Sequence, residues 1–70
     1  MDRSDSFGPV LKRVRVERGL TQEQLAEAAG LHRTEISLLE RSRRKPLLET
    51  IVVICRGLGV TPGELLDQVR

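Results

Sequence analysis

The turn signals of this 70-residue sequence divide it into five short segments, and each segment has the apolar spacing of a helix. Glycines at positions 19, 30 and 59 interrupt the apolar pattern, as glycine does where a helix ends in a left-handed residue. No stretch alternates apolar and polar residues over the length of a strand. The sequence therefore predicts an all-α domain of five short helices.

The composition limits the domain to a small aliphatic core. A chain of this length forms one domain at most, and its single aromatic residue, Phe7, leaves the core to Leu, Ile, Val and Ala. Residues 1–6 are expected to form a flexible tail, and residues 7–70 a single domain. Ten of the twelve cations are Arg, whose planar fork matches phosphate and base edges, so the composition permits a nucleic-acid partner without requiring one.

Other functional classes are disfavoured. The single cysteine, Cys55, excludes an internal disulfide and a Cys-based zinc site. No apolar run approaches the roughly 18 residues of a membrane-spanning helix, and the N-terminus lacks the apolar region of a signal peptide. We therefore expect a cytoplasmic protein that does not contact a membrane. With one His, one Cys and scattered acids, the sequence shows no catalytic cluster, no metal or cofactor site and no small-molecule site.

Capping signals mark the starts of three segments. In TQEQ, Thr21 is placed to cap a helix while Gln24 reaches back to the cap residue, which makes a capping box. TPGE repeats this signal at positions 61–64, with proline at the first helical position. Gly8 and Pro9 predict the start of the first helix in the same way.

The apolar spacing also predicts which residues are buried. The fourth helix is expected to span about 47–57. The predicted core residues are Phe7, Val10, Leu11 and Val14 in the first helix, Leu25, Ala26 and Ala29 in the second, Ile36 and Leu39 in the third, and Leu48, Ile51, Ile54, Cys55 and Leu58 in the fourth.

Two of these helices lie within twenty residues, TQEQLAEAAGLHRTEISLLE. Small residues at Ala26 and Ala29 allow the two backbones to approach closely, and Gly30 allows a sharp turn. Two helices that cross steeply over such a turn form a helix-turn-helix. A plain helical hairpin inside a small bundle has the same spacing and remains the alternative.

From about Val10 to Leu66 the sequence resembles the Cro and phage-repressor type of DNA-binding domain, the xenobiotic-response-element (XRE) family. The resemblance rests on GLTQEQLA, on the IS-LLE pattern of the third helix and on LGVTPGELL. It implies a five-helix lambda-repressor-like domain and a transcriptional regulator, of bacterial or phage origin, that binds double-stranded DNA in a sequence-specific way. Within the family, the short chain and the segment HRTEIS resemble controller proteins of restriction–modification systems. The alternative function is an antitoxin-type module that sequesters a toxin and regulates its own gene.

The resemblance also implies roles for individual residues. The family places the third helix in the major groove, where its outward residues read bases. Glu35 is instead placed as a reciprocal cap. The base-reading candidates are Arg33, Thr34, Ser37 and Leu38. The phosphate-binding candidates are Gln22 and the four cations of the following loop, Arg41, Arg43, Arg44 and Lys45. A solvated surface charge is the alternative for Arg33 and for one or two of the loop cations, and a surface glutamine is the alternative for Gln22.

Arg15 and Glu40 match a family pair that forms a salt bridge between the first helix and the end of the third. If buried, this pair orients the helix-turn-helix and leaves Arg15 partly available to phosphate.

Three positions depart from the family. His32 and Leu47 stand where a small polar cap is usual, and Ser42 stands where glycine is common, so a left-handed backbone there would carry a cost.

An apolar surface near the C-terminus predicts a homodimer. The family usually has a charged residue at the position of Val53, and here it is apolar beside Val52. Leu66 and Val69 extend this surface, and an exposed apolar patch on a small domain usually marks an interface. We therefore expect these four residues to form a two-fold interface and the operator to be an inverted repeat. The alternative is that Val53 packs against the fifth helix of its own domain.

Overall fold

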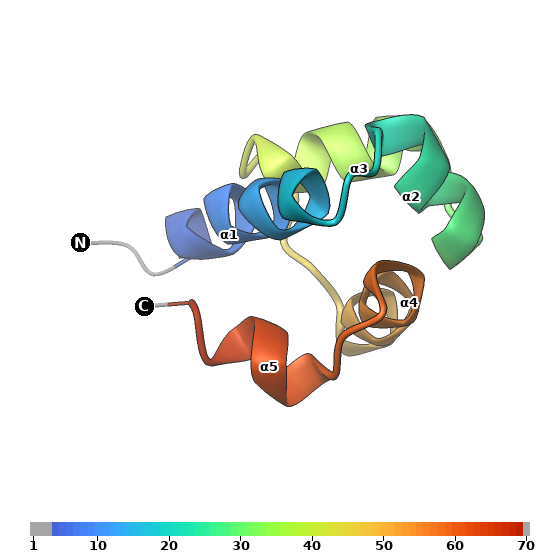
Figure 1. Cartoon of the computed structure of the whole chain (residues 1–70). Coiled ribbons are helices and arrows are strands. Elements are labelled where there is room, and N and C mark those ends of the chain that lie inside the picture. Colours follow the sequence, from blue (N-terminus) through green and yellow to red (C-terminus); the bar gives the residue numbers. More distant parts are fainter. Residues whose placement is uncertain (1–3, 70) are drawn as a thin grey trace.

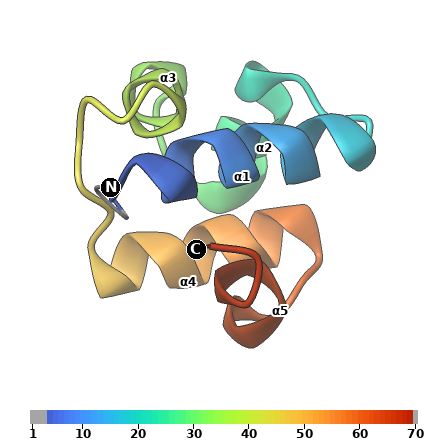
Figure 2. The same ribbon diagram turned by 90° about the vertical axis from the view of Figure 1, so that its left-hand side faces the viewer.

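The computed structural model describes residues 4–69, with side chains from residue 7 onward. It contains the helices α1 (Ser4–Glu17), α2 (Gln22–Ala29), α3 (Arg33–Glu40), α4 (Leu48–Leu58) and α5 (Pro62–Leu66). No strand occurs within residues 4–69, and the predicted all-α fold of five helices is confirmed. Helices α1, α2 and α3 form one layer, and α4 and α5 pack on one side of it (Figure 1 and Figure 2).

Helix α1 begins earlier than its sequence predicts. It starts at Ser4 and contains Pro9 in its interior, so the expected start near Gly8 is wrong. A proline inside a helix removes one backbone hydrogen bond, but Phe7 is buried in the core, and such packing can override local preference. Residues 4–6 of the expected tail therefore belong to the first turn of α1, and residues 1–3 lie outside the described residues.

The predicted helix ends are confirmed in detail. The Thr21 Oγ1 atom accepts a hydrogen bond from the Gln24 amide at 3.0 Å, and Gln24 Oε1 accepts one from the Thr21 amide at 2.9 Å. The same reciprocal pair caps α5. Helices α2 and α4 end at Gly30 and Gly59, whose φ values of 72° and 77° are left-handed. Each of these features depends only on residues a few positions apart.

All five helices contribute to one apolar core. The buried cluster comprises Phe7, Val10, Leu11, Val14, Leu25, Ala26, Ile36, Leu39, Ile54, Cys55, Leu58 and Leu65, with Ile51 partly buried against it. Leu48 was a predicted core residue and is 75% exposed, so that prediction is wrong. Leu48 is the first residue of α4, whereas the last turns of α4 lie against α2, where Gly57 faces Leu25 and Ala29. Spacing identifies an apolar stripe but not which of its turns a neighbouring helix covers.

Gly8 allows α1 to approach the end of α3. A Cβ atom at this position would lie 2.6 Å from the carbonyl oxygen of Glu40 and 2.7 Å from that of Leu39. Backbone carbonyls cannot rotate away as a flexible side chain can, so any larger residue would push the two helices apart. This contact places α1 along the edge of the α2–α3 unit.

Ser42 follows α3 in the left-handed conformation, with φ of 58°. A residue with a Cβ pays about 1–2 kcal/mol for this conformation, while glycine costs about 0.5–1 kcal/mol more backbone entropy on folding. We therefore expect Ser42→Gly to raise the free energy of unfolding by about 0.5–1 kcal/mol. Urea unfolding followed by circular dichroism measures the change. Ser42→Ala is the control, and a glycine variant no more stable than the alanine variant would contradict the prediction.

Candidate nucleic-acid interface

Helices α2 and α3 form the helix-turn-helix that the sequence predicts. Gly30 reverses the chain, and the amide of Leu31 donates to the carbonyl of Ala26 at 2.8 Å, which closes the end of α2. Ala26 and Ala29 are buried on the inner face of α2. Their small side chains let the two helices pack closely across a connection of only three residues, so α3 has a fixed orientation on α2.

The outer face of α3 carries the four predicted base-reading residues. Ile36 and Leu39 point into the core. The predicted set lies on the other side: Arg33 and Thr34 are exposed, and Ser37 and Leu38 are half-buried. Arg33 and Thr34 belong to the first turn of α3. A polar, solvent-facing first turn on a rigid helix is the arrangement that can enter the major groove.

The start of α3 is capped by Glu35 rather than by the side chain at the cap position. Glu35 Oε1 accepts a hydrogen bond from the His32 amide at 3.2 Å. The reciprocal-cap prediction for Glu35 is confirmed, and this carboxylate is partly committed to the backbone.

The predicted pair of Arg15 and Glu40 is buried, with the two residues 9% and 8% exposed. The Arg15 Nε atom lies 2.6 Å from Glu40 Oε2, and Arg15 Nη2 lies 3.1 Å from Glu40 Oε1. Arg15 Nη1 donates to the carbonyl of Leu20 at 2.8 Å. All three nitrogens of Arg15 therefore donate within the protein, which does not support the expectation that Arg15 stays partly available to phosphate.

Gln22 is a third member of this network, which the sequence did not predict. Its Nε2 atom donates to Glu40 Oε1 at 3.0 Å. The side-chain amide of Gln22 has a second hydrogen that can donate to another group. Gln22 is also the first residue of α2, where the backbone N–H groups have no partner within the helix. The carboxylate of Glu40 thus fixes the side chain that resembles the phosphate-contacting glutamine of the family. The network ties α1, α2 and α3 together at one point.

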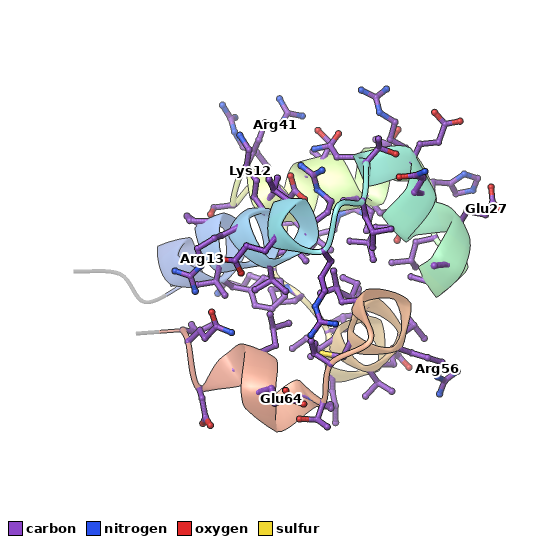
Figure 3. All side chains as sticks on the ribbon, in the orientation of Figure 1. Lys12, Arg13, Glu27, Arg41, Arg56 and Glu64 are labelled. Carbon is purple, nitrogen blue, oxygen red and sulfur yellow. The ribbon has the colours of Figure 1, made fainter. Side chains whose placement is uncertain are left out.

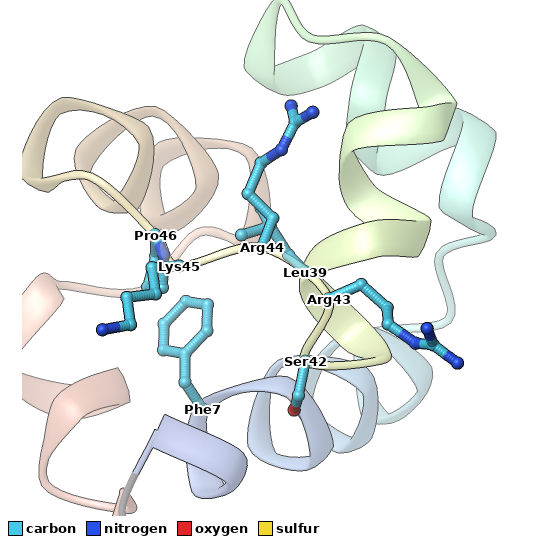
Figure 4. Close-up of a pocket in the computed structure, with 7 residues that line it drawn as sticks. All are labelled: Phe7, Leu39, Ser42, Arg43, Arg44, Lys45 and Pro46. Carbon is cyan, nitrogen blue, oxygen red and sulfur yellow. The ribbon is translucent and has the colours of Figure 1, made fainter.

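The four loop cations are all exposed and do not converge on one another. Arg41 Nε lies 3.4 Å from the carbonyl oxygen of Ser37, so its side chain bends back along α3. Figure 4 shows Arg43, Arg44 and Lys45 pointing in different directions around a pocket of about 230 Å³. The remaining lining residues are Phe7, Leu39, Ser42 and Pro46. Divergent cations suit a long phosphate backbone better than one small anion.

The apolar surface is larger than the sequence predicted and is centred on the start of α4. Leu47 and Leu48 are 62% and 75% exposed, and Val52 is 38% exposed. With Glu49 and the half-buried Val53 they line one groove.

The two predicted interface residues near the C-terminus differ in exposure. Leu66 is 41% exposed, whereas Val69 packs partly against the core of its own domain. The role of all four predicted interface residues stays a prediction, with Leu47 and Leu48 as additions.

Cys55 is a core residue rather than a reactive group. Burial, with a smaller contribution from the charge of Glu64, raises the pKa of its thiol, so the thiol stays protonated near neutral pH. Within residues 4–69 no three His, Cys, Asp or Glu side chains lie close enough to hold a metal ion. In the same part of the chain, no helix has both the length and the apolar character needed to cross a bilayer.

Comparison with known proteins identifies the fold family. The profile of the family described as Helix-turn-helix matches residues 11–65. The chain is 42% identical over 62 residues to control protein C.BamHI of Bacillus amyloliquefaciens, covering 87% of this chain and 76% of that protein. It is 36% identical over 68 residues to control protein C.SmaI of Serratia marcescens, covering 97% and 81%.

A solved structure agrees with the sequence matches. The restriction-modification controller protein C.AhdI from Aeromonas hydrophila superposes with a TM-score of 0.85 at 35% identity, covering 89% of this chain and 94% of that one. The family and these relatives confirm the expectation that the chain is not an enzyme. The chain belongs to the XRE-type helix-turn-helix family, as its sequence resemblance implies.

Proposed function

We propose that this protein is a transcriptional regulator that binds double-stranded DNA in a sequence-specific way, with α3 as the recognition helix in the major groove. The observation that carries the proposal is the outer face of α3, which presents Arg33 and Thr34 to solvent from a helix fixed by a buried network. The control proteins among the relatives support this function over the antitoxin-type alternative. The cytoplasm of a bacterium is the corresponding location.

The residues of this surface divide by role. A base-reading role suits Arg33 best, because its guanidinium can donate two hydrogen bonds to one guanine. Thr34 offers a hydroxyl and a methyl group, Ser37 a hydroxyl, and Leu38 only apolar contact. Phosphate contacts are assigned to Gln22 and to the loop cations, Arg41, Arg43, Arg44 and Lys45. Phosphate contacts supply affinity and register, and base contacts supply specificity.

Arg33→Ala should relax the preference for one base pair in each half-site. The expected loss of discrimination at that position is about 1–3 kcal/mol, because a bidentate contact to guanine disappears. Competition binding with operators substituted at single positions measures it. Arg56→Ala, which removes an exposed arginine from α4, is the matched control. Equal weakening on every DNA sequence would make Arg33 a phosphate contact instead.

The working unit that we propose is a homodimer. A single α3 contacts few base pairs, whereas a two-fold pair places two recognition helices about one helical turn of DNA apart, roughly 34–36 Å. The groove at the start of α4 presents an apolar surface that a second copy can cover with the same surface.

Selection of bound sequences from a random DNA pool tests the whole proposal. We expect an inverted repeat, and the absence of any enriched sequence would refute sequence-specific binding.

A further inference from the structure

We propose that Lys12 on α1 is a further phosphate-binding residue, which extends the DNA interface beyond the helix-turn-helix and its following loop. The inference rests on the proposed function. The geometry behind it is the contact between α1 and the C-terminal end of α3.

Lys12 lies on the side of α1 that faces α3. Gly8, Lys12 and Arg15 are spaced by four and three residues, so they follow one another along one face of the helix. Gly8 packs against the backbone of Glu40, and Arg15 binds the carboxylate of the same residue. Lys12 is therefore held between two contacts to the end of α3.

The side chain of Lys12 is exposed, although both neighbours on this face are buried. It leaves the α1–α3 contact at its solvent edge, next to the start of the basic loop. Figure 3 shows Lys12 and Arg41 on the same upper side of the molecule, with Arg13 lower on α1 and with Arg56 and Glu64 in the lower half of the view. The charge of Lys12 thus lies on the same side of the molecule as that of Arg41, the first of the loop cations.

The other cation on this face of α1 is already committed. Arg15 directs all three of its nitrogens toward Glu40 and Leu20, so Lys12 is the exposed cation on this face of α1 whose charge can reach a phosphate. A lysine suits that task because its ammonium is a point charge on a flexible stem that follows a phosphate without strict geometry. The contact supplies affinity and no base preference.

The test compares two adjacent cations of α1. Lys12→Gln and Arg13→Gln remove one charge each from exposed positions on the same helix, but Arg13 points away from α3 and donates to Gln68. We expect Lys12→Gln to weaken binding about 3- to 10-fold on operator and random DNA alike at physiological salt. The slope of log K against log salt should fall by about 0.9 for each subunit bound. Arg13→Gln should change affinity less than about 2-fold and leave the slope unchanged.

Two further measurements make the result decisive. Lys12→Arg should restore the slope, and circular dichroism should show unchanged helix content in every variant. Equal effects of Lys12→Gln and Arg13→Gln would overturn the proposal, because the charge would then act only through the overall field. An unchanged slope for Lys12→Gln would overturn it as well. If the unsubstituted protein selects no DNA sequence, the proposed function is wrong. If the unsubstituted protein selects a sequence and Lys12→Gln has no effect on binding, only the inference about Lys12 is wrong.

Discussion

Glu40→Ala is expected to lower the free energy of unfolding by about 3–5 kcal/mol. The substitution leaves the guanidinium of Arg15 buried without its carboxylate, and it removes the acceptor of the Gln22 amide. A 70-residue domain has a total stability on the order of 4–10 kcal/mol. The variant should therefore be close to unfolding at room temperature and should lose DNA binding with its fold.

Urea unfolding at neutral pH measures this effect. Glu27→Ala is the matched control, because Glu27 is an exposed acid on α2 and its removal changes the net charge equally. The control should stay within about 0.5 kcal/mol of the original protein. Replacing both partners, with Arg15→Met and Glu40→Leu, should be less destabilising than Glu40→Ala alone, since no buried charge is left unpaired. A loss for Glu40→Ala no greater than for Glu27→Ala would show that the buried pair contributes little.

The features predicted correctly from the sequence are those that depend on local chemistry. The capping box of Thr21 and the left-handed ends at Gly30 and Gly59 involve residues within a few positions of one another. The start of α1 and the exposure of Leu48 depend instead on which other helix covers a given turn. The apolar spacing predicted that Phe7 is buried, but Pro9 pointed to a later start of the helix, and only the packing of Phe7 in the core shows that α1 continues back to Ser4.

The candidate site likewise contains some features that local sequence predicts and others that depend on contacts between distant residues. The outward face of α3 follows from its buried face, so the positions of Arg33 and Thr34 could be predicted without a structure. The resemblance to the XRE family supplied the pairing of Arg15 with Glu40, which are 25 positions apart. The bond from Gln22 to Glu40 joins residues 18 positions apart and has no sequence signal. Lys12 could be placed only once Gly8 was seen to pack against the end of α3.

The start of α4 is the surface through which we propose that the homodimer forms. Helix α4 begins at Leu48, and the cap residue Leu47 has no side-chain hydrogen bond to the helix. Both leucines expose apolar surface, which is unfavourable for a monomer in water and is typical of an interface. The sequence predicted Val53 as an interface residue, but its side chain is half-buried. A charge at this position would therefore disturb the fold of the domain as well as an interface. Val52 is the cleaner position for a test because it is more exposed and lines the same groove.

Val52→Glu is expected to convert the protein to a monomer at tens of micromolar and to weaken binding to the inverted-repeat operator by about 100-fold or more. Each subunit would bury one carboxylate in the apolar interface, at a cost of several kcal/mol. A tenfold loss of affinity corresponds to about 1.4 kcal/mol. Analytical ultracentrifugation gives the mass, and titration of full and half operators gives the affinities. Val16→Glu is the matched control, since Val16 is an exposed valine on α1, and it should leave the dimer intact. If the Val52→Glu variant still sediments as a dimer, the interface lies elsewhere. If the original protein binds one half-site as tightly as the full repeat, the dimer is not the working unit.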